Sequence, residues 1–320
     1  GASSNCPPHL SAIAKHMGIK INLEAWQRLG HDIPLLVNCK PAGEHLMERF
    51  YKAGGIPAVM QELVKQKKLH TSVLTVSGKT VGENLKIKIQ LDSDVIKSFA
   101  DPVVENAGFI VMRSNFFNSA VMKTSVISEE FRERYLSNPK HPNAFEAKAV
   151  VFEGPEDYHH RINSSKLKID KHSILIIRGC GPVGYPGSAE VVNMQPPDQL
   201  LKQGINALPT LGDGRQSGTS ESPSILNVSP ESAIGGDLGI VKTGDKLRID
   251  LNKRRVDLLI SQAEFKKRRK QKKIPKLNNQ TPWQEISRKT VGQLEDGACM
   301  NLNGVYLDIV NKKGLPRNSH

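Results

Sequence analysis

Apolar residues recur at helical spacing through the first part of the chain. In the segment HLSAIAKHM they return every three or four positions, which is typical of one buried helix face. The Gly54-Gly55 pair punctuates two further helical segments and suits a helix cap. This part predicts an α/β arrangement, with helices over His9–Met17, Leu23–Leu29, Ala42–Tyr51 and Ile56–Lys65 and a buried strand over Ile33–Asn38.

The pattern changes near Ile96, where short apolar runs begin to alternate with turn residues. These runs are mostly rich in β-branched residues, which is typical of strands, and the pattern alone favours a β-rich α+β region. We therefore place a domain boundary between residues 1–95 and 96–320. The runs predict strands over Phe109–Met112, Val121–Ile127, Ala149–Phe152, Ser173–Arg178, Lys246–Leu251 and Arg255–Ile260, and helices over Asp198–Gln203 and Ser261–Arg269.

Two glycine-rich segments interrupt this region and are too polar to pack a core. Leu211 to Ser222 reads LGDGRQSGTSES, and Arg178 to Met194 reads RGCGPVGYPGSAEVVNM. Glycines let the backbone approach a ligand closely, and hydroxyls with a guanidinium provide donors for a carboxylated, polyhydroxylated molecule. The two segments together predict a ligand site with a carboxylate on one loop and serines on the other.

Longer strings carry a family resemblance. The strings are GYPGSAEVVNM, GDGRQSGTS, SPESAIGGDLGIVKTGD, GASSNCPPHL, GPEDYHHRIN and the closing PRNSH. They resemble the dihydroxy-acid dehydratase and phosphogluconate dehydratase family, and within it the sugar-acid (aldonate) dehydratase branch. The resemblance spans the chain. It implies that residues 1–95 are the end of an α/β cluster-binding domain and that residues 96–320 form a swivelling β/β/α barrel-like domain.

Members of this family are about twice as long, and the chain resembles their carboxy-terminal half. The resemblance implies an iron–sulfur- and Mg²⁺-dependent hydro-lyase whose cluster cysteines and most magnesium ligands lie in a missing amino-terminal half. We therefore expect this chain to be inactive alone and to assemble with that half into a homo-oligomer acting on a small sugar acid. Whether the cluster is 2Fe–2S or 4Fe–4S, and which sugar acid is used, stays open at this point.

Composition restricts the remaining possibilities. The chain has 320 residues, 38% of them hydrophobic, so it can bury sizeable cores, and no apolar run approaches the ~20 residues of a membrane span. Its four cysteines are scattered without a CxxC pair, which suits a reducing compartment and provides no iron–sulfur ligand set. We expect a cytoplasmic location, with organellar targeting left open because the start of the chain resembles the inside of a motif.

The formal net charge is +13, and much of it comes from the run EFKKRRKQKKIPK, Glu264 to Lys276. One interpretation is a localisation signal or a phosphate-binding patch. We favour a solvated helix end and loop, because aromatic residues are only 5% of the chain and none interleaves with the run as base stacking requires. This argues against a nucleic-acid partner, while a positive field suits an anionic substrate.

Dehydration of a 2,3-dihydroxy acid requires a Lewis acid on the carboxylate and a base near the adjacent carbon. The resemblance assigns Glu190 as a metal ligand, against the alternative of a solvated glutamate. It assigns Ser217 as the base and Thr219 as a neighbouring donor, with Ser220 as a rival base. For all three hydroxyls the alternative is a serine-rich turn that satisfies its own backbone. The expected substrate-binding residues are Arg215, Ser220 and Asn5.

Other polar residues are weaker candidates. Asp198 is one, and Asp213 is expected to stabilise its own glycine turn. The adjacent His159 and His160 point in different directions, and a structural role is favoured for them. Cys180 is expected to be a packed thiol, and the terminal His320 could reach a substrate.

Two classes of function remain from the sequence. The first is a hydro-lyase that converts an aldonate to a 2-keto-3-deoxy acid, or, as an alternative substrate, a branched-chain dihydroxy acid. The second is a non-catalytic module that binds anions or nucleic acid. The intact glycine-rich strings favour the enzyme.

Overall fold

The computed structural model describes residues 2–217 and 223–314 of the chain. Contacts divide it into two compact units: residues 29–108 with 124–126, and residues 2–28 and 109–123 with the chain from 127 onward. None of the described helices combines the length and the apolar character needed to cross a bilayer.

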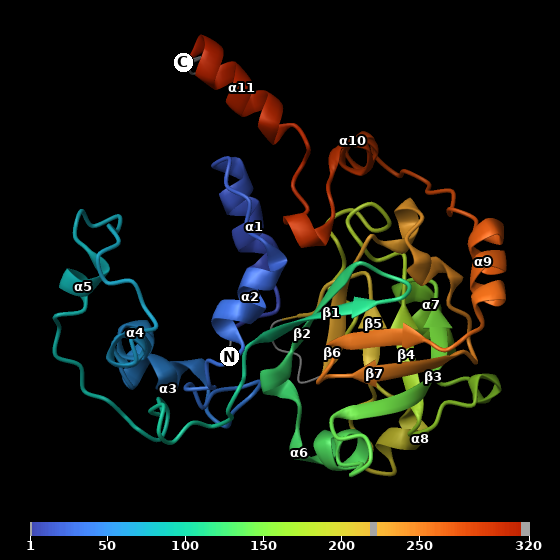
Figure 1. Cartoon of the computed structure of the whole chain (residues 1–320), viewed down its shortest axis with the longest axis horizontal. Coiled ribbons are helices and arrows are strands. Elements are labelled where there is room, and N and C mark those ends of the chain that lie inside the picture. The colour runs from blue at the N-terminus through green and yellow to red at the C-terminus, as the bar shows by residue number, and fades with distance from the viewer. Residues whose placement is uncertain (1, 218–222, 315–320) are drawn as a thin grey trace. The chain divides into compact units, whose positions relative to one another are not determined.

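The second unit contains a closed barrel of mixed strands in the order β1-β2-β6-β5-β4-β3-β7-β8 (Figure 1). Antiparallel pairing joins β1 to β2, β2 to β6, β3 to β7 and β7 to β8, and the other four junctions are parallel. Closure leaves no unpaired sheet edge. The strands are β1 (Phe109–Ser114), β2 (Ser119–Lys123), β3 (Ala144–Phe152), β4 (Ser173–Ile177), β5 (Thr210–Gly212), β6 (Ser224–Ser229), β7 (Lys246–Asp250) and β8 (Arg255–Leu258).

Alternating residues of these strands fill the barrel. The main buried cluster includes Met112, Met122 and Ile176. The residues next to each of these in its own strand point outward, because successive residues of a strand face opposite sides. Outward residues such as Phe152, Leu175 and Ile177 form a second cluster with Tyr158 and Val192. This second cluster attaches the Arg178–Met194 segment to the outside of the barrel.

Helices of this unit lie on the outside of the barrel, with α7 and α9 beside its strands (Figure 1). Ser261 begins α9 by accepting a hydrogen bond from the backbone of Glu264 at 3.2 Å, a helix cap. The helices are α1 (Cys6–His16), α2 (Leu23–Gly30), α6 (Glu129–Phe131), α7 (Pro155–Arg161), α8 (Asp198–Leu201), α9 (Gln262–Gln271), α10 (Pro282–Thr290) and α11 (Asn303–Lys313).

The first unit packs α3 (Met47–Lys52), α4 (Gly55–Lys65) and α5 (Val81–Asn84) with extended segments. Phe50, Ala58 and Ile96 are buried in its core. Gly54 precedes α4 with φ of 108°, a backbone conformation that favours glycine, so the expected glycine cap is present.

Two predictions for this first unit were wrong. Residues 33–38 are largely buried but form no strand, because their hydrogen bonds alternate between Val104 and the 95–97 segment and give only isolated bridges. The helix expected from Ala42 begins only at Met47. Before it the chain makes a tight turn, in which a Cβ on Gly43 would lie 2.5 Å from the backbone of Asn38.

In the barrel unit the predictions did better. All six expected strands are present, although the strand expected to reach Ile127 ends at Lys123 and continues as a 3₁₀ turn over Thr124–Val126. Both expected helices are present as α8 and α9. The strands β5 and β6, which flank the glycine-rich Leu211–Ser222 segment, were missed.

Candidate active site

The two glycine-rich segments lie side by side outside the barrel. The backbone N–H of Arg215 donates to the carbonyl of Ala189 at 2.9 Å, and the N–H of Val192 donates back to Arg215 at 3.1 Å. The predicted ligand-binding loops therefore form one surface, and this pairing places Glu190 beside Arg215.

Three of the predicted site residues converge on this surface. The Asn5 amide nitrogen donates to Glu190 Oε1 at 2.6 Å, and Arg215 donates to the same oxygen at 3.2 Å. Arg215 also donates to Asn5 Oδ1 at 3.2 Å, which closes a triangle of polar contacts. The residues come from the opening segment and both loops, as a shared site requires.

Arg215 is fixed by the loop opposite to it. Its Nε donates to the carbonyl of Ser188 at 2.9 Å, and its second terminal nitrogen donates to the carbonyl of Gly187 at 3.2 Å. A planar guanidinium that makes several bonds at once has little rotational freedom. The Arg215–Glu190 pair is thus held in place, with Glu190 remaining 36% exposed for a ligand.

Asp213 is fully buried and holds together the loops that form this surface. Its carboxylate accepts from the N–H groups of Gly179 (3.1 Å) and Cys180 (2.9 Å) and from Ser232, through the N–H at 2.9 Å and the hydroxyl at 2.6 Å. The expectation that Asp213 stabilises its own turn was wrong: it joins its loop to two other segments. A buried carboxylate needs such donors because water is absent.

Glu231 is a second buried carboxylate of the site region, and it was not predicted from the sequence. It accepts from the N–H groups of Val183 (2.9 Å) and Gly184 (2.8 Å) and from the side chain of Gln293 (2.8 Å). Burial raises the pKa of Glu231, while these donors act in the opposite direction. Glu231 thus fixes the middle of the Arg178–Met194 segment.

Some glycines of the two segments are required by close approach. A Cβ on Gly214 would lie 2.8 Å from the carbonyl of Ala189 and 2.9 Å from the Cβ of Cys180. A Cβ on Gly181 would lie 2.5 Å from the Glu231 carboxylate. The loops and their carboxylate anchors can therefore touch only where side chains are absent.

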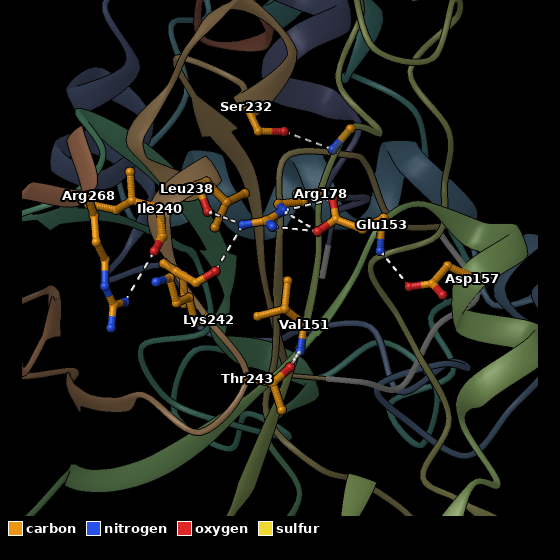
Figure 2. Close-up of polar contacts among 12 residues, drawn as sticks. Val151, Glu153, Asp157, Arg178, Ser232, Leu238, Ile240, Lys242, Thr243 and Arg268 are labelled. Carbon is orange, nitrogen blue, oxygen red and sulfur yellow. Dashed lines mark hydrogen bonds and ion pairs between the residues drawn. The ribbon is translucent and has the colours of Figure 1, made fainter. Parts of the chain in front are cut away.

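Arg178 holds the start of the Arg178–Met194 segment. Figure 2 shows its side chain between Glu153, with which it forms an ion pair, and Leu238. The guanidinium donates to the carbonyls of Leu238 (3.1 Å) and Val241 (2.9 Å). These contacts tie the end of β4 to the 3₁₀ turn Asp237–Ile240 in the matching SPESAIGGDLGIVKTGD string.

The remaining predicted residues are placed as follows. Ser217 is half-buried, two residues beyond Arg215, whereas Thr219, Ser220 and His320 lie outside the described residues. Asp198 begins α8 and bonds the Asn163 side chain, and it makes no contact with the Asn5–Glu190–Arg215 triangle among the described hydrogen bonds.

His159 and His160 are exposed on α7, and the structural role expected for them stays a prediction. Cys180 is fully buried, which confirms the expected packed thiol, and burial raises the pKa of this thiol.

The basic run only partly fits the solvated-face interpretation. Lys266, Lys267 and Lys270 are exposed on α9. Arg268, however, makes a bidentate pair with Asp245 at 2.5 and 3.0 Å. Lys272 bonds the largely buried carboxylate of Asp237 at 2.6 Å. This part of the run therefore attaches α9 to the barrel unit.

The donor set can be compared with the two cofactors implied by the resemblance. The cysteines are free thiols, and no three of the described His, Cys, Asp and Glu side chains gather into a metal-binding group. An iron–sulfur cluster therefore does not fit the described chain. Magnesium needs as few as one or two protein carboxylates, and Glu190 Oε2 accepts no hydrogen bond from the described residues. By this criterion the Glu190 carboxylate is compatible with a magnesium ion, and its role as a ligand stays a prediction.

Comparison with protein families agrees with this arrangement. The carboxy-terminal domain of dihydroxy-acid/6-phosphogluconate dehydratases matches residues 94–298, and the amino-terminal domain of the same proteins matches residues 1–84. The chain belongs to this family.

Individual relatives refine the branch. The chain is 54% identical over its whole length to the D-xylonate dehydratase of Caulobacter vibrioides, covering 53% of that protein. It is 40% identical to the L-arabinonate dehydratase of Rhizobium leguminosarum bv. trifolii over 84% of the chain and 45% of the relative. The dihydroxy-acid dehydratase of Ignicoccus hospitalis is 34% identical over 84% of the chain and 46% of the relative. The chain thus resembles the sugar-acid branch more, and it spans about half the length of these curated relatives.

Proposed function

We propose that this chain is part of a hydro-lyase that dehydrates an aldonate to a 2-keto-3-deoxy acid. The observation that carries the proposal is the convergence of Asn5, Glu190 and Arg215 from three separate family strings. The high identity to a D-xylonate dehydratase supports a pentonate as the substrate. Because the chain spans about half of that relative, we propose that the complete site also uses residues equivalent to the relative's remaining segment.

The reaction removes a proton from C2 and hydroxide from C3. In the proposal the Ser217 oxygen, once deprotonated, takes the C2 proton, and the electron pair of the C–H bond forms the C2–C3 double bond as hydroxide leaves. The enol then tautomerises, with a proton added at C3, so the net change is the loss of one water. Ser217 lies two residues from Arg215, whose fork is fixed by Ser188.

The other residues hold the substrate in the proposal. Arg215 and Asn5 would present donors toward substrate oxygens, and Thr219 and Ser220, which lie outside the described residues, would contribute the hydroxyl donors implied by the family string. Glu190 is the ligand that this chain would contribute to magnesium; when bound, the ion would supply Lewis-acid polarisation of the substrate carboxylate. The described residues do not fit an iron–sulfur cluster, so none of them is assigned a role in holding one.

The test is a dehydration assay of the chain, alone and co-expressed with the segment of the Caulobacter vibrioides relative outside the matched region. Iron, sulfide and magnesium are added, and 2-keto acid formation is measured from D-xylonate, L-arabinonate and 2,3-dihydroxyisovalerate. The variants are Ser217→Ala and Glu190→Gln, with the exposed Ser137→Ala as a matched control.

We expect 2-keto acid from an aldonate in the co-expressed assembly, no product from the chain alone, and loss of product in both site variants only. Preferential turnover of 2,3-dihydroxyisovalerate would place the protein in the branched-chain branch instead. Full activity of Ser217→Ala would move the base to Ser220 or to the other segment. Absence of product from every substrate in a correctly assembled, metal-loaded protein would favour the non-catalytic module.

A further inference from the structure

Lys123, the last residue of β2, is a buried cation that has no counterion among the residues the structure describes. It is 6% exposed, and no hydrogen bond or ion pair joins its Nζ to another residue within 2–217 and 223–314. Other shielded cations of this unit are paired: Arg268 bonds Asp245, and Lys272 bonds Asp237. Burying an unpaired ammonium destabilises the folded state. An anionic ligand bound at Lys123 would offset this cost.

The strand pattern places Lys123 on the outer face of the barrel. Its neighbour Met122 belongs to the cluster inside the barrel, so the side chain of Lys123 points to the opposite side. Lys123 pairs with Phe109 of β1, and the ring of Phe109 meets Trp26 edge-on at 6.1 Å between centroids. Apolar groups therefore lie beside the stem of this lysine, and only 6% of the residue is exposed to water.

Two features bring Lys123 close to the candidate active site. Met122 of β2 pairs with Ile225 of β6, so Lys123 lies beside the first residue of β6, Ser224. The glycine-rich segment that contains Ser217 precedes Ser224 in the chain. On the other side, Cys6 interacts electrostatically with Lys123, and Cys6 directly follows Asn5 of the polar triangle. Burial lowers the pKa of Lys123, and Cys6 acts in the opposite direction.

The charge balance of the site indicates what Lys123 would bind. Glu190 and Arg215 form an ion pair, so these two side chains together carry no net charge, and any positive charge on this surface comes from a bound magnesium ion or from another residue. An aldonate carries a carboxylate, and a desolvated ammonium is a strong partner for such a group. Lys123 would supply the positive charge that the Glu190–Arg215 pair does not.

We propose that Lys123 is a substrate-binding residue that forms an ion pair with the carboxylate of the sugar acid. The inference rests on the proposed function for the identity of the anion. It adds a residue that belongs to none of the strings carrying the family resemblance.

The test compares Lys123→Met, Lys123→Arg and Cys6→Ala with wild type in the co-expressed assembly. Lys148→Met, an exposed lysine on β3, is the matched control. We expect Lys123→Met to raise KM for D-xylonate about ten- to a hundredfold, as loss of a charged hydrogen bond does, with a smaller change in kcat. Lys123→Arg should recover part of this loss, and Cys6→Ala should leave KM unchanged.

Thermal unfolding separates this role from a structural one without requiring turnover. Without ligand, Lys123→Met should unfold at the same or a higher temperature than wild type, because it removes an unpaired buried charge. D-Xylonate should raise the unfolding temperature of wild type and of Lys148→Met but not of Lys123→Met.

A wild-type shift without any turnover would overturn the proposed reaction and leave the Lys123 proposal standing. Equal ligand shifts in wild type and Lys123→Met, no shift in wild type, or a destabilised Lys123→Met with unchanged KM would overturn the Lys123 proposal. If Cys6→Ala reproduced the KM effect, Cys6 would be the partner of Lys123 and the proposal would also fail.

Discussion

Ser232 donates to Asp213 twice, through its backbone N–H at 2.9 Å and its hydroxyl at 2.6 Å. Because the same carboxylate also accepts from Gly179 and Cys180, three segments that are distant in sequence meet at one buried group. The Glu190–Arg215 surface is built on two of these segments. Asp213 is therefore a positioning residue, and its effect on the site passes through the backbone that it holds.

Asp213→Asn should destabilise the fold. An amide replaces one acceptor oxygen with a donor, so at least one of the N–H groups of Gly179, Cys180 and Ser232 loses its partner in a dry environment. We expect the free energy of unfolding to fall by about 2–4 kcal/mol. Urea unfolding measures it, with the exposed Asp198→Asn as a control that should change by less than about 0.5 kcal/mol. Equal effects of the two variants would contradict the anchoring role.

Glu231 predicts a pH dependence of stability. Burial raises the pKa of Glu231 above its ordinary value of 4.5, so the folded state binds the proton more tightly than the unfolded state. The stabilising contribution is complete below the ordinary pKa and is lost as pH rises through the raised pKa. Glu231→Gln cannot titrate, so the unfolding free energy of the variant relative to wild type should increase with pH in that window, by at most about 1.4 kcal/mol per pH unit.

The measurement is urea unfolding of both proteins between pH 4 and pH 8. Glu285→Gln is a control of opposite sign, because Lys289 lowers the pKa of the exposed Glu285. The Glu285 contribution is present above its ordinary pKa and lost as pH falls through the lowered value. A Glu231→Gln difference that is flat with pH, or that follows the sign of Glu285→Gln, would refute the burial argument.

Arg268 predicts that part of the basic run stabilises the fold. Its guanidinium and the Asp245 carboxylate are each 10% exposed, so removing one partner leaves a shielded charge. Arg268→Met should lower the free energy of unfolding by about 3–5 kcal/mol. The exposed Lys270→Met should change it by less than about 0.5 kcal/mol. Adding Asp245→Asn to Arg268→Met should recover part of the loss, and a purely additive double variant would argue against coupling.

Much of the barrel could be predicted because its longer strands are β-branched runs bounded by turns. The exceptions have physical causes. β5 has three residues, Thr210–Gly212, and it merges into the glycine-rich segment, so no periodicity could develop. Residues 33–38, which were wrongly predicted to form a strand, are largely buried, as their apolar side chains favour. Burial alone does not provide a neighbouring strand with which they could pair, and only isolated bridges form. Barrel closure depends on pairings such as β1 with β8, which no local pattern encodes.

Residues of the candidate site could be predicted from the sequence where they belong to strings that resemble the family. The contacts themselves were not, since Asn5 and Glu190 are 185 positions apart and meet only through the fold. Asp213 and Glu231 as anchors had no signal in a single sequence, because a buried acid and a solvated one look alike there. Glycines with no room for a Cβ, such as Gly181 against Glu231, were the nearest available hint.

Arg215→Lys tests whether the fork geometry, and not only the charge, builds the active site. Lysine keeps the positive charge but cannot bond Ser188, Gly187 and Asn5 at once, so Glu190 would lose its fixed partner. In the co-expressed assembly we expect kcat/KM for D-xylonate to fall on the order of a hundredfold, the size typical of a misplaced site group. The unfolding free energy should change by less than about 1 kcal/mol, because Arg215 is partly exposed. Arg248→Lys, a partly exposed barrel residue near Glu146, is the matched control and should retain wild-type kcat/KM. If Arg215→Lys kept full activity, charge alone would suffice, and the convergence of Asn5, Glu190 and Arg215 would lose its mechanistic meaning.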